Sequence, residues 1–573
     1  MRLRRTIAGI TLLAALALAP AAQAKGTAYF VGATNLVSAQ AIGPAGGLTP
    51  IGTAPAANTP HAGAISPDGR NLYVSNFGGG GSVSAYTIGA NGGLTPLGDT
   101  PSGLFTEGVA VTPNGQFVYA ANSGVPSITG YSRANNGTLT PAGSVSTGAT
   151  VGTNVTGLAV TPDGAFLFAT NRGANSVSAF SIGAGGQLSP VAGSPFGAGT
   201  NPVGIAVTPD IKFAYVSNLG SGSVTGYSIN PNGSLTPIGN FPTGGTTPFT
   251  LAISPDGRFV YTANSGSTNT SALAINADGS LTPVPGQPFP AGTEPFGVDA
   301  APNSRQVYVT NRVSNNVNAY DRGAGGELTQ ITGSPFPAGV TNLEFQSVTI
   351  TPNQGPTAVF TAESPGAGQQ SLFNASSSSD TDGGSIAAYQ WDFGDGSATE
   401  TTTTPTTSHT YAAQGDYQVT LTVIDDEGCA NQQVFTGQTA DCNPSTPGAR
   451  ATQTLQVAGG APPNLKLKGK KQELAKKVTV TAKTTEDTDA VAKGSLKLEQ
   501  KSGKTQSYDL KKAKKSLEGG EKTKLKPKLS KKAYKKAKKT LNHDGKVTAN
   551  VKVKVKDADG DTDKDSVKVK LTK

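Results

Sequence analysis

A short pattern recurs along most of the chain at a nearly fixed interval. In each copy an apolar stretch runs into a tight turn built on Pro-Asp-Gly or a close variant, and a second apolar stretch follows. The turn prolines are Pro67, Pro113, Pro162, Pro209, Pro255, Pro302 and Pro352, at spacings of 46, 49, 47, 46, 47 and 50 residues. Such a period indicates repeated structural units that stack on one another, because one unit of this size cannot bury its apolar face alone.

Residues 249–283 show what one unit contains. Four short stretches with strand character are separated by turns rich in Gly, Asn and Asp, which is typical of an antiparallel meander. The second stretch ends in an aromatic-x-x-Asn pattern that returns in other copies as YVSN, YAAN, FATN, YVSN, YTAN and YVTN, beginning at Tyr73, Tyr119, Phe168, Tyr215, Tyr261 and Tyr308. Four strands per period of this length predict a β-propeller.

The two ends of the repeat region predict the number of blades. Residues 27–52 contain second to fourth strands without a first strand, and residues 345–351 supply only a first strand. Six complete copies and this composite blade give seven. Pairing of the two ends closes the ring and removes free sheet edges, which invite aggregation. We expect the propeller over residues 25–354, with the closing blade drawn from residues 25–60 and 343–354.

These repeats resemble the YVTN-repeat and seven-bladed lactonase propellers. That superfamily includes bacterial phosphogluconolactonase-like and fungal muconate-cyclising proteins. The resemblance covers residues 25–353 and implies the fold directly. It implies lactone hydrolysis less directly, because propellers carry many unrelated functions.

A site is expected on the face where the channel-lining first strand of each blade begins. The residues six before each turn proline open these strands: His61, Glu107, Thr156, Val203, Phe249, Phe296 and Gln346. Arg172 and Arg312 follow blade asparagines on the same face, and Glu294 and Asp299 are candidate binding residues near it. Lactone opening needs a base that activates water and a cation that stabilises the oxyanion, and this set contains both.

Three interpretations of the propeller stay open. His61 is its sole histidine, and two phenylalanines at the entrance favour an apolar or plugged channel, so the leading expectation is a non-catalytic binding or adhesion protein. The alternative is a 6-phosphogluconolactonase-like or muconate-lactone-like hydrolase that uses His61, Glu107, Arg172 and Arg312. It requires that these side chains come within reach of one substrate. A purely structural spacer in a surface layer is the third and predicts self-association.

Residues 1–24 have the features of a signal peptide. Three arginines precede an apolar core at residues 7–18 that is too short to cross a bilayer, and Ala22-Gln23-Ala24 suits a signal peptidase. No later stretch could cross a membrane, so the mature chain is expected to lack a transmembrane segment. We expect an exported bacterial protein, secreted or associated with the cell surface.

Residues 355–458 follow another pattern. The stretches NASSSSDTDG (374–383), YQWDFGDG (389–396), HTY (409–411) and GDYQVTLTV (415–423) resemble a PKD domain, an immunoglobulin-like β-sandwich. Trp391, the one tryptophan of the chain, is expected in its core, and His409 is expected to be structural. Such a domain is expected to act as a spacer or an interaction module.

Two features of this domain concern ligands and cross-links. Some PKD domains bind calcium, and the resemblance implies that Asp380, Asp382, Asp392 and Asp395 could supply oxygen ligands. Turn formation explains the same aspartates, so our expectation is no cofactor. Cys429 and Cys442 are the only cysteines, and in an exported protein they predict a disulfide.

Residues 459–573 form a lysine-rich region. Residues 461–573 hold 33 Lys against 14 Asp and Glu, a net charge of +19, and because the whole chain carries +9, residues 1–460 carry −10. Apolar residues alternate with polar or lysine residues at 478–482, 496–498, 551–555 and 567–571, which predicts a sheet buried on one side. Residues 530–541 predict one short helix with Ser530 as N-cap. We expect a small β-sandwich-like domain.

The charge of this region predicts its partners. A net charge of +19 attracts anionic polymers of the cell envelope, and we expect the region to bind such polymers. An equally weighted alternative is a soluble domain without such a partner. No aromatic interleaving is present, so specific nucleic-acid binding is not expected. The acidic run at 557–565 fits a hairpin turn better than a calcium loop, because its glycine falls at the fourth position and not the sixth. For the propeller we expect an extracellular protein or polysaccharide as partner.

Overall fold

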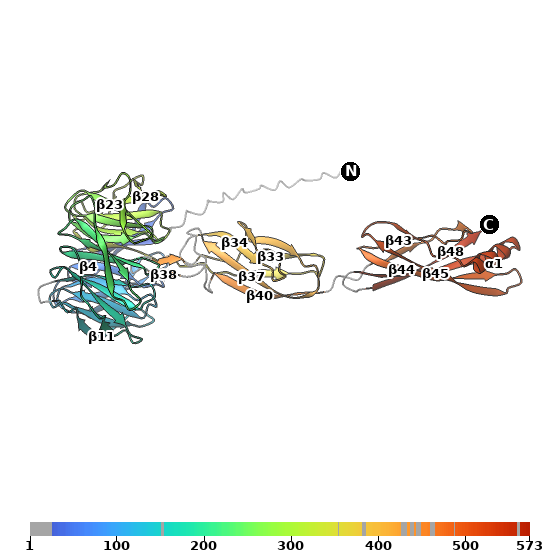
Figure 1. Ribbon diagram of the computed structural model, residues 1–573, viewed down its shortest axis with the longest axis horizontal. Coiled ribbons are helices and arrows are strands. Elements are labelled where there is room, and N and C mark those ends of the chain that lie inside the picture. The colour runs from blue at the N-terminus through green and yellow to red at the C-terminus, as the bar shows by residue number, and fades with distance from the viewer. Residues whose placement is uncertain are drawn as a thin grey trace, which may run out of the picture. The chain divides into compact units, whose positions relative to one another are not determined.

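The computed structural model describes residues 26–149, 154–352, 354–380, 385–425, 433–435, 440–442, 449–458, 464–485, 487–557 and 562–573. Strands dominate these residues, and their one helix is α1 (Lys531–Asn542) (Figure 1). The prediction of an all-β protein is thereby confirmed. Within the same residues no helix is long and apolar enough to cross a membrane. The predicted signal peptide, residues 1–24, lies outside the described residues.

Seven antiparallel sheets form the propeller, and the first strand of each contacts the first strands of its neighbours around the channel. Blades one to three contain β4 (Pro60–Ile65), β5 (Asn71–Asn76), β6 (Ser82–Ile88), β7 (Leu94–Pro101); β8 (Thr106–Val111), β9 (Phe117–Asn122), β10 (Ser127–Arg133), β11 (Leu139–Ser146); and β12 (Val155–Val160), β13 (Phe166–Asn171), β14 (Ser176–Ile182), β15 (Leu188–Pro190), β16 (Phe196–Gly197). Blades four to six contain β17 (Pro202–Val207), β18 (Phe213–Asn218), β19 (Ser223–Ile229), β20 (Leu235–Pro242); β21 (Pro248–Ile253), β22 (Phe259–Asn264), β23 (Asn269–Ile275), β24 (Leu281–Pro283), β25 (Phe289–Pro290); and β26 (Pro295–Ala300), β27 (Gln306–Asn311), β28 (Asn316–Arg322), β29 (Leu328–Gln330), β30 (Phe336–Pro337).

The seventh blade joins the two ends of the propeller sequence. Its strand order is β3 (Leu48–Pro55), β2 (Leu36–Ile42), β1 (Thr27–Gly32) and β31 (Leu343–Ile350). The predicted count of seven blades is confirmed, and β31 contacts both β26 and β4. The ring is therefore closed through backbone pairing of β1 with β31.

The repeated aromatic-x-x-Asn pattern links adjacent blades. The hydroxyl of Tyr73 donates to the carbonyl of Gly137 in the next blade at 2.8 Å, and Tyr308 donates to Gly46 across the closing seam at the same distance. The blade asparagines form hydrogen bonds with the backbone of nearby loops. Asn122 Oδ1, for example, accepts a hydrogen bond from the backbone N–H of Gly103. The repeat therefore consists of positions that a propeller uses to hold its blades together.

The PKD region is a sandwich of two sheets. One sheet has the order β32 (Thr361–Glu363), β33 (Gln370–Asn374), β36 (Thr406–Thr410), and the other has the order β35 (Glu400–Thr402), β34 (Ile386–Asp392), β37 (Gly415–Asp425), β40 (Arg450–Val457). Trp391 is fully buried between them against the rings of Phe360 and Phe373, as the sequence predicts. A separate pair is formed by β38 (Gln433–Phe435) and β39 (Ala440–Cys442). Cys429 and the side chain of Cys442 lie outside the described residues, so the disulfide stays a prediction.

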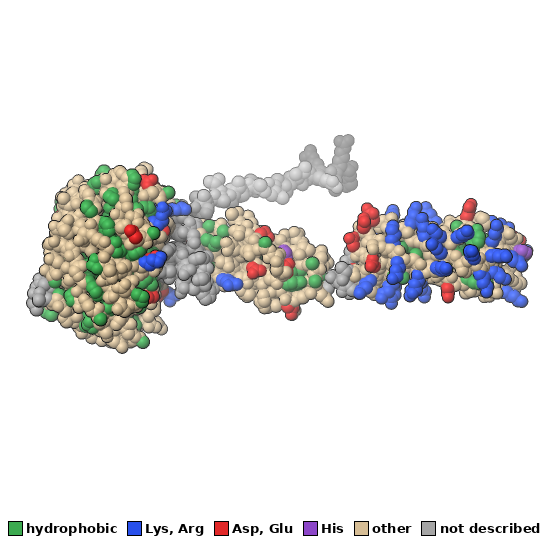
Figure 2. All heavy atoms as spheres, viewed as in Figure 1, with side chains coloured by type: hydrophobic (Ala, Val, Ile, Leu, Met, Phe, Trp, Pro, Cys, Tyr) green, Lys and Arg blue, Asp and Glu red, His purple; other side chains and the backbone are tan. Residues whose placement is uncertain are grey.

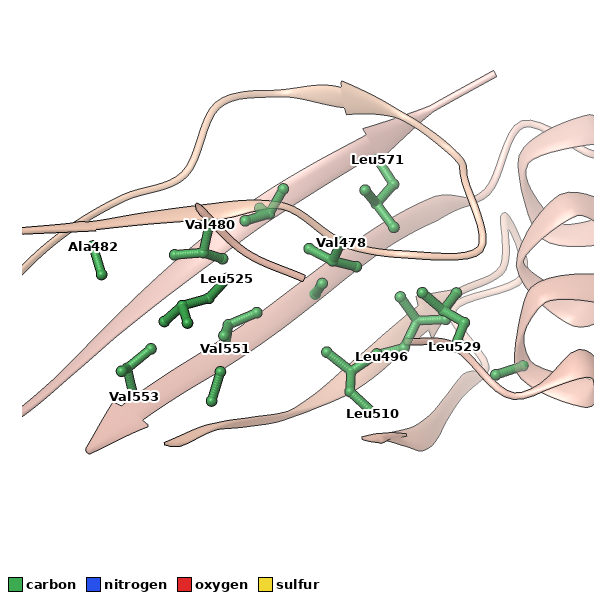
Figure 3. Packing of buried hydrophobic residues seen from close by; sticks show 14 of the residues in the cluster. Val478, Val480, Ala482, Leu496, Leu510, Leu525, Leu529, Val551, Val553 and Leu571 are labelled. Atoms are coloured by element: carbon green, nitrogen blue, oxygen red, sulfur yellow. The ribbon is translucent and has the colours of Figure 1, made fainter. Parts of the chain in front are cut away.

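The lysine-rich region, called the tail module below, also packs two sheets on one core. They have the orders β41 (Lys466–Lys468), β43 (Val480–Lys483), β46 (Thr523–Leu525), and β42 (Gln472–Glu473), β48 (Thr562–Thr572), β47 (Lys546–Lys556), β44 (Thr488–Glu499), β45 (Thr505–Leu517). Figure 3 shows apolar side chains of the two sheets meeting between them. Ser530 caps α1 by accepting from the N–H of Ala533, which confirms the predicted helix start.

Candidate functional site

The strands that open at the channel mouth are held in place by hydroxyl groups of the blade motif. Ser75 donates to the carbonyl of Glu107, and Thr170 and Ser217 donate to the carbonyls of Val203 and Phe249. Each hydroxyl belongs to one blade and each carbonyl to the next. The backbone of a mouth residue is therefore fixed by its neighbouring blade, which makes the mouth a rigid place to present side chains.

His61, at the start of β4, lies between two carboxylates from adjacent blades. Its Nδ1 is 3.1 Å from Glu107 Oε2, and its Nε2 is 3.6 Å from Glu344 Oε2. All three side chains are largely but not fully buried, with 13%, 10% and 13% of their surface exposed. Both ring nitrogens thus face acidic groups at the edge of solvent.

Glu344 was not among the residues expected from the sequence. Counting six residues back from Pro352 selects Gln346, but β31 contains a register irregularity opposite β1, between Phe30 and Gly32. Counting forward from the residue with positive φ that precedes each first strand gives the right position. Asn342 (φ 51°) precedes Glu344 by two residues, as Glu294 (φ 58°) precedes Phe296. The last interval of 50 residues was the signal that this blade contains an insertion.

Arg312 and Glu294 extend this group. Arg312 Nη1 lies 3.3 Å from Glu294 Oε1, Nη2 lies 3.9 Å from Glu344 Oε1, and the guanidinium stands 5.0 Å from the centre of the Phe296 ring. We call His61, Glu107, Glu294, Arg312 and Glu344 the mouth cluster. Burial raises the pKa of Glu344, and the neighbouring Arg312 guanidinium opposes this shift only in part.

Phenylalanine rings line another part of the mouth. Phe249 and Phe296 stack with ring centres 3.8 Å apart, and the buried Phe345 lies 6.0 Å from Phe249 and 6.2 Å from His61. The expected phenylalanine-lined entrance is therefore present. A second aromatic series runs from His61 to Phe77 and on to Phe105, with ring centres 5.2 and 4.9 Å apart.

Exposed apolar side chains lie beside this mouth in loops of blades two and six. Leu104, Phe105, Val125 and Val313 expose between 43% and 59% of their surface, and all four belong to loops that open on the mouth face. Leu104 and Phe105 also approach Gly124, next to Val125. We call these four residues the apolar rim. Exposed apolar residues that gather around a polar centre are typical of binding faces.

Two of the candidate residues lie apart from the mouth cluster. The backbone N–H of Arg172 donates to Asn154 O, and within the described residues no contact joins its guanidinium to the cluster. Asp299 lies near the far end of β26 and is 1% exposed, with Oδ1 accepting from the N–H of Ala300. Its burial raises its pKa well above the usual range. Asp299 is therefore an interior residue of the channel wall, not a surface ligand.

Two of the aspartates considered for calcium, Asp392 and Asp395, act in turns. Asp392 accepts from the N–H of Gly394 and Asp395 from that of Ser397. Asp395 Oδ2 also lies 2.7 Å from His409 Nε2, and His409 stacks on Phe393. Asp382 lies outside the described residues. Among those described, no group of three or more acidic, His or Cys side chains is placed to hold a metal ion.

Family models match two parts of the chain. The model described as "Lactonase, 7-bladed beta-propeller" matches residues 146–202 and 195–294, and the PKD domain model matches residues 353–439. The chain is a lactonase-like seven-bladed β-propeller followed by a PKD domain. His61, Glu107, Arg312 and Glu344 all lie outside the matched propeller segments, so the match describes the fold more than the mouth cluster.

Solved structures resemble the propeller as a whole. A candidate 6-phosphogluconolactonase from Bacteroides uniformis is 22% identical with a TM-score of 0.51, and the periplasmic gluconolactonase PpgL of Pseudomonas aeruginosa is 22% identical with a TM-score of 0.50. Each alignment covers 57% of this chain and 99% of the other. At these identities the likeness establishes the shared propeller fold alone.

Curated relatives match a much shorter segment of the chain. The microbial collagenase of Vibrio alginolyticus is 45% identical over 80 residues, which is 14% of this chain and 10% of the collagenase. The pre-pro-metalloprotease PrtV of Vibrio cholerae is 45% identical over 82 residues, 8% of its length. The match thus spans a tenth or less of these relatives.

Proposed function

We propose that the propeller hydrolyses an uncharged sugar-acid lactone at its channel mouth. The observation that carries this proposal is the position of His61 between Glu107 and Glu344, with Arg312 joined to the same group through Glu344. The sequence favoured a non-catalytic propeller because potential catalytic residues were sparse. Glu344 supplies a further carboxylate that was not among the candidate residues expected from the sequence. The side chains of His61, Glu107 and Arg312 lie together with it at the channel mouth.

The cluster contains the groups that lactone opening requires. Water attacks the ring carbonyl while His61, oriented by Glu107, takes up its proton. Arg312 stabilises the oxyanion of the tetrahedral intermediate. When the ring C–O bond breaks, the departing alkoxide takes a proton from Glu344. The raised pKa of Glu344 suits it to this acid role, since the carboxyl keeps its proton to a higher pH than usual.

The charge of the mouth cluster selects the substrate class. With Glu344 protonated, the carboxylates of Glu107 and Glu294 still outnumber the one guanidinium, so a phosphorylated lactone would meet net repulsion, whereas a neutral lactone would not. Hydrolysis turns the neutral lactone into a hydroxy-acid anion, which the same carboxylates repel. The acidic mouth therefore favours entry of a neutral substrate and departure of its charged product.

The test is hydrolysis by the mature chain of matched lactones with and without a phosphate group, measured against the spontaneous rate. We expect turnover of the neutral lactone and a loss of about 100-fold or more in kcat/KM for His61→Ala. Lys212→Ala, on the opposite face of the propeller, is the control and should retain full activity. Turnover that His61→Ala leaves intact, or no turnover above the spontaneous rate, would refute the proposal.

The apolar rim supports a second candidate, a non-catalytic binding face. Leu104, Phe105, Val125 and Val313 offer contact area of the kind that protein partners bury. On this interpretation the mouth cluster gives polar specificity at the centre, and the PKD domain serves as a spacer. The apolar rim would then be required for retention of an extracellular partner, and lactone turnover would be absent.

We also infer that the chain acts outside the cytoplasm. The basic and apolar pattern of residues 1–24 and the PKD domain support this inference. Sequencing of the N-terminus of the protein recovered from culture medium or cell surface tests it, with Lys25 expected as the first residue. An uncleaved protein confined to the cytoplasm would contradict it.

A further inference from the structure

One face of the larger tail sheet is covered with lysines. Apolar residues of β44, β45, β47 and β48 point to the core, and the alternate residues point outward to solvent. We call the following set the lysine face: Lys493, Lys497, Lys514, Lys552, Lys554, Lys556, Lys564, Lys568 and Lys570. Figure 2 shows how densely basic side chains cover the tail module.

The register of this sheet places like charges directly opposite each other. Lys493 pairs with Lys552 across β44 and β47, and Lys554 pairs with Lys564 across β47 and β48. In the described part of the tail module no ion pair joins any of these four lysines to a carboxylate. Opposed like charges destabilise a sheet, so this arrangement costs stability that an anionic ligand would restore.

The spacing of the lysine face suits an extended polymer. Neighbouring strands are about 4.8 Å apart and residues on one face repeat about every 6.8 Å along a strand, so the ammonium groups form a regular grid. Asp489, Glu499 and Asp509 are acidic side chains that share this face. A linear chain with repeated negative charges can contact many of these ammonium groups at once.

The composition of the tail module distinguishes between classes of polyanion. No large hydrophobic side chain is exposed in its described residues, so nothing there would insert into a bilayer. Residues 451–573 contain no arginine, and the two tyrosines of the module, Tyr508 and Tyr534, pack against its core, so bases would find no stacking surface. We propose that the lysine face binds a linear anionic polysaccharide. This does not depend on the channel mouth.

The test compares two fourfold variants of the mature chain. In one, Lys493, Lys552, Lys554 and Lys564 are all replaced by Gln. In the matched control, the exposed Lys522, Lys524, Lys526 and Lys528, on and beside β46, are replaced instead. Both variants lose four charges. Binding to immobilised polygalacturonate and dextran sulfate is measured across a salt series, with neutral dextran as the blank.

We expect the lysine-face variant to lose at least about tenfold in affinity and to show a shallower salt dependence, because fewer counterions are released. The control should lose less than about threefold. The lysine-face variant should also unfold at an equal or higher temperature at low salt, which separates lost binding from lost folding. Equal losses in both variants would overturn the proposal, since net charge alone would explain them. Stronger binding to anionic vesicles or to single-stranded DNA than to either polysaccharide would also overturn it.

Discussion

His61 Nε2 lies 3.6 Å from Glu344 Oε2, although the two residues come from opposite ends of the propeller sequence. The contact exists because β31 closes the ring beside β1 and reaches the first strand of blade one. The acid that we assign to lactone opening is therefore supplied by the strand that completes the fold.

Glu344→Gln tests this assignment directly. Removing the acid should lower kcat/KM for an uncharged lactone by about 100-fold or more, with a smaller effect on KM. Steady-state kinetics against pH is the measurement, and the fall in wild-type activity as pH rises through the pKa of Glu344 should be lost in the variant. Glu327→Gln, in an exposed turn, is the control. Equal activity in the two variants would remove Glu344 from the mechanism.

Asp299 predicts a pH dependence of propeller stability. Its folded pKa lies well above that of the unfolded chain, so the native state binds the proton more tightly. The stability that Asp299 contributes is fully present below its pKa in the unfolded chain, about 3.9. It is lost as pH rises through the pKa of Asp299 in the folded protein. Asp299→Asn should therefore gain stability over the wild type at pH 8 and little at pH 4.

Calorimetry of the propeller transition across this pH range measures the effect. Glu327→Gln should run parallel to the wild type, because its carboxylate is exposed. A variant at Asp299 that is destabilised equally at every pH would show that the carboxylate is needed for its hydrogen bond alone.

Asp395 predicts the opposite trend in the PKD domain. Burial would raise its pKa, but hydrogen bonds from Ser397 and His409 outweigh it and hold the pKa at about 2. The stability that the Asp395 carboxylate contributes is present above its pKa in the unfolded chain, and it is lost as pH falls from about 4 toward 2. Asp395→Asn should cost about 1 kcal/mol at pH 7 after allowance for solvent screening, and almost nothing at pH 2.

The fluorescence of Trp391 reports this unfolding within the full chain, because the only tryptophan lies in the PKD core. Asp416→Asn, at an exposed carboxylate of the same domain, is the control. The interpretation fails if the Asp395 variant and the control lose equal stability at pH 7.

Tyr308→Phe tests the closing seam. The change removes the hydrogen bond to Gly46 and leaves a buried carbonyl unpaired, which should cost about 1–2 kcal/mol. Hydrogen exchange of β1 and β31 should accelerate more than that of β17 and β18. Tyr215→Phe, which removes the equivalent bond to Gly279 between blades inside the sequence, is the matched comparison. Uniform acceleration over all blades would argue against a local seam.

The sequence predicted the repeated parts of this protein well. Tyr73 and Asn122 recur because every blade seam needs the same hydrogen bonds, so a period in the sequence reports a contact in space. The mouth was predicted less well because it is where the repeats differ. The insertion in β31 moves Glu344 into the position that the spacing predicts for Gln346. Asp299 is buried in the channel wall, and the spacing of residues in the sequence does not reveal this burial.

Because the seventh blade is composite, the mouth cluster is complete only after β31 has paired with β1. A chain that has emerged only as far as blade six has His61 and Glu107 but neither the carboxylate of Glu344 nor a partner for the free edge of β1. Chemical competence and protection from edge-to-edge association are acquired together, when a single strand docks. On the function proposed above, the mouth gains activity only when this strand docks, and loss of the strand would remove Glu344 together with the contacts that β31 makes to β26 and β4.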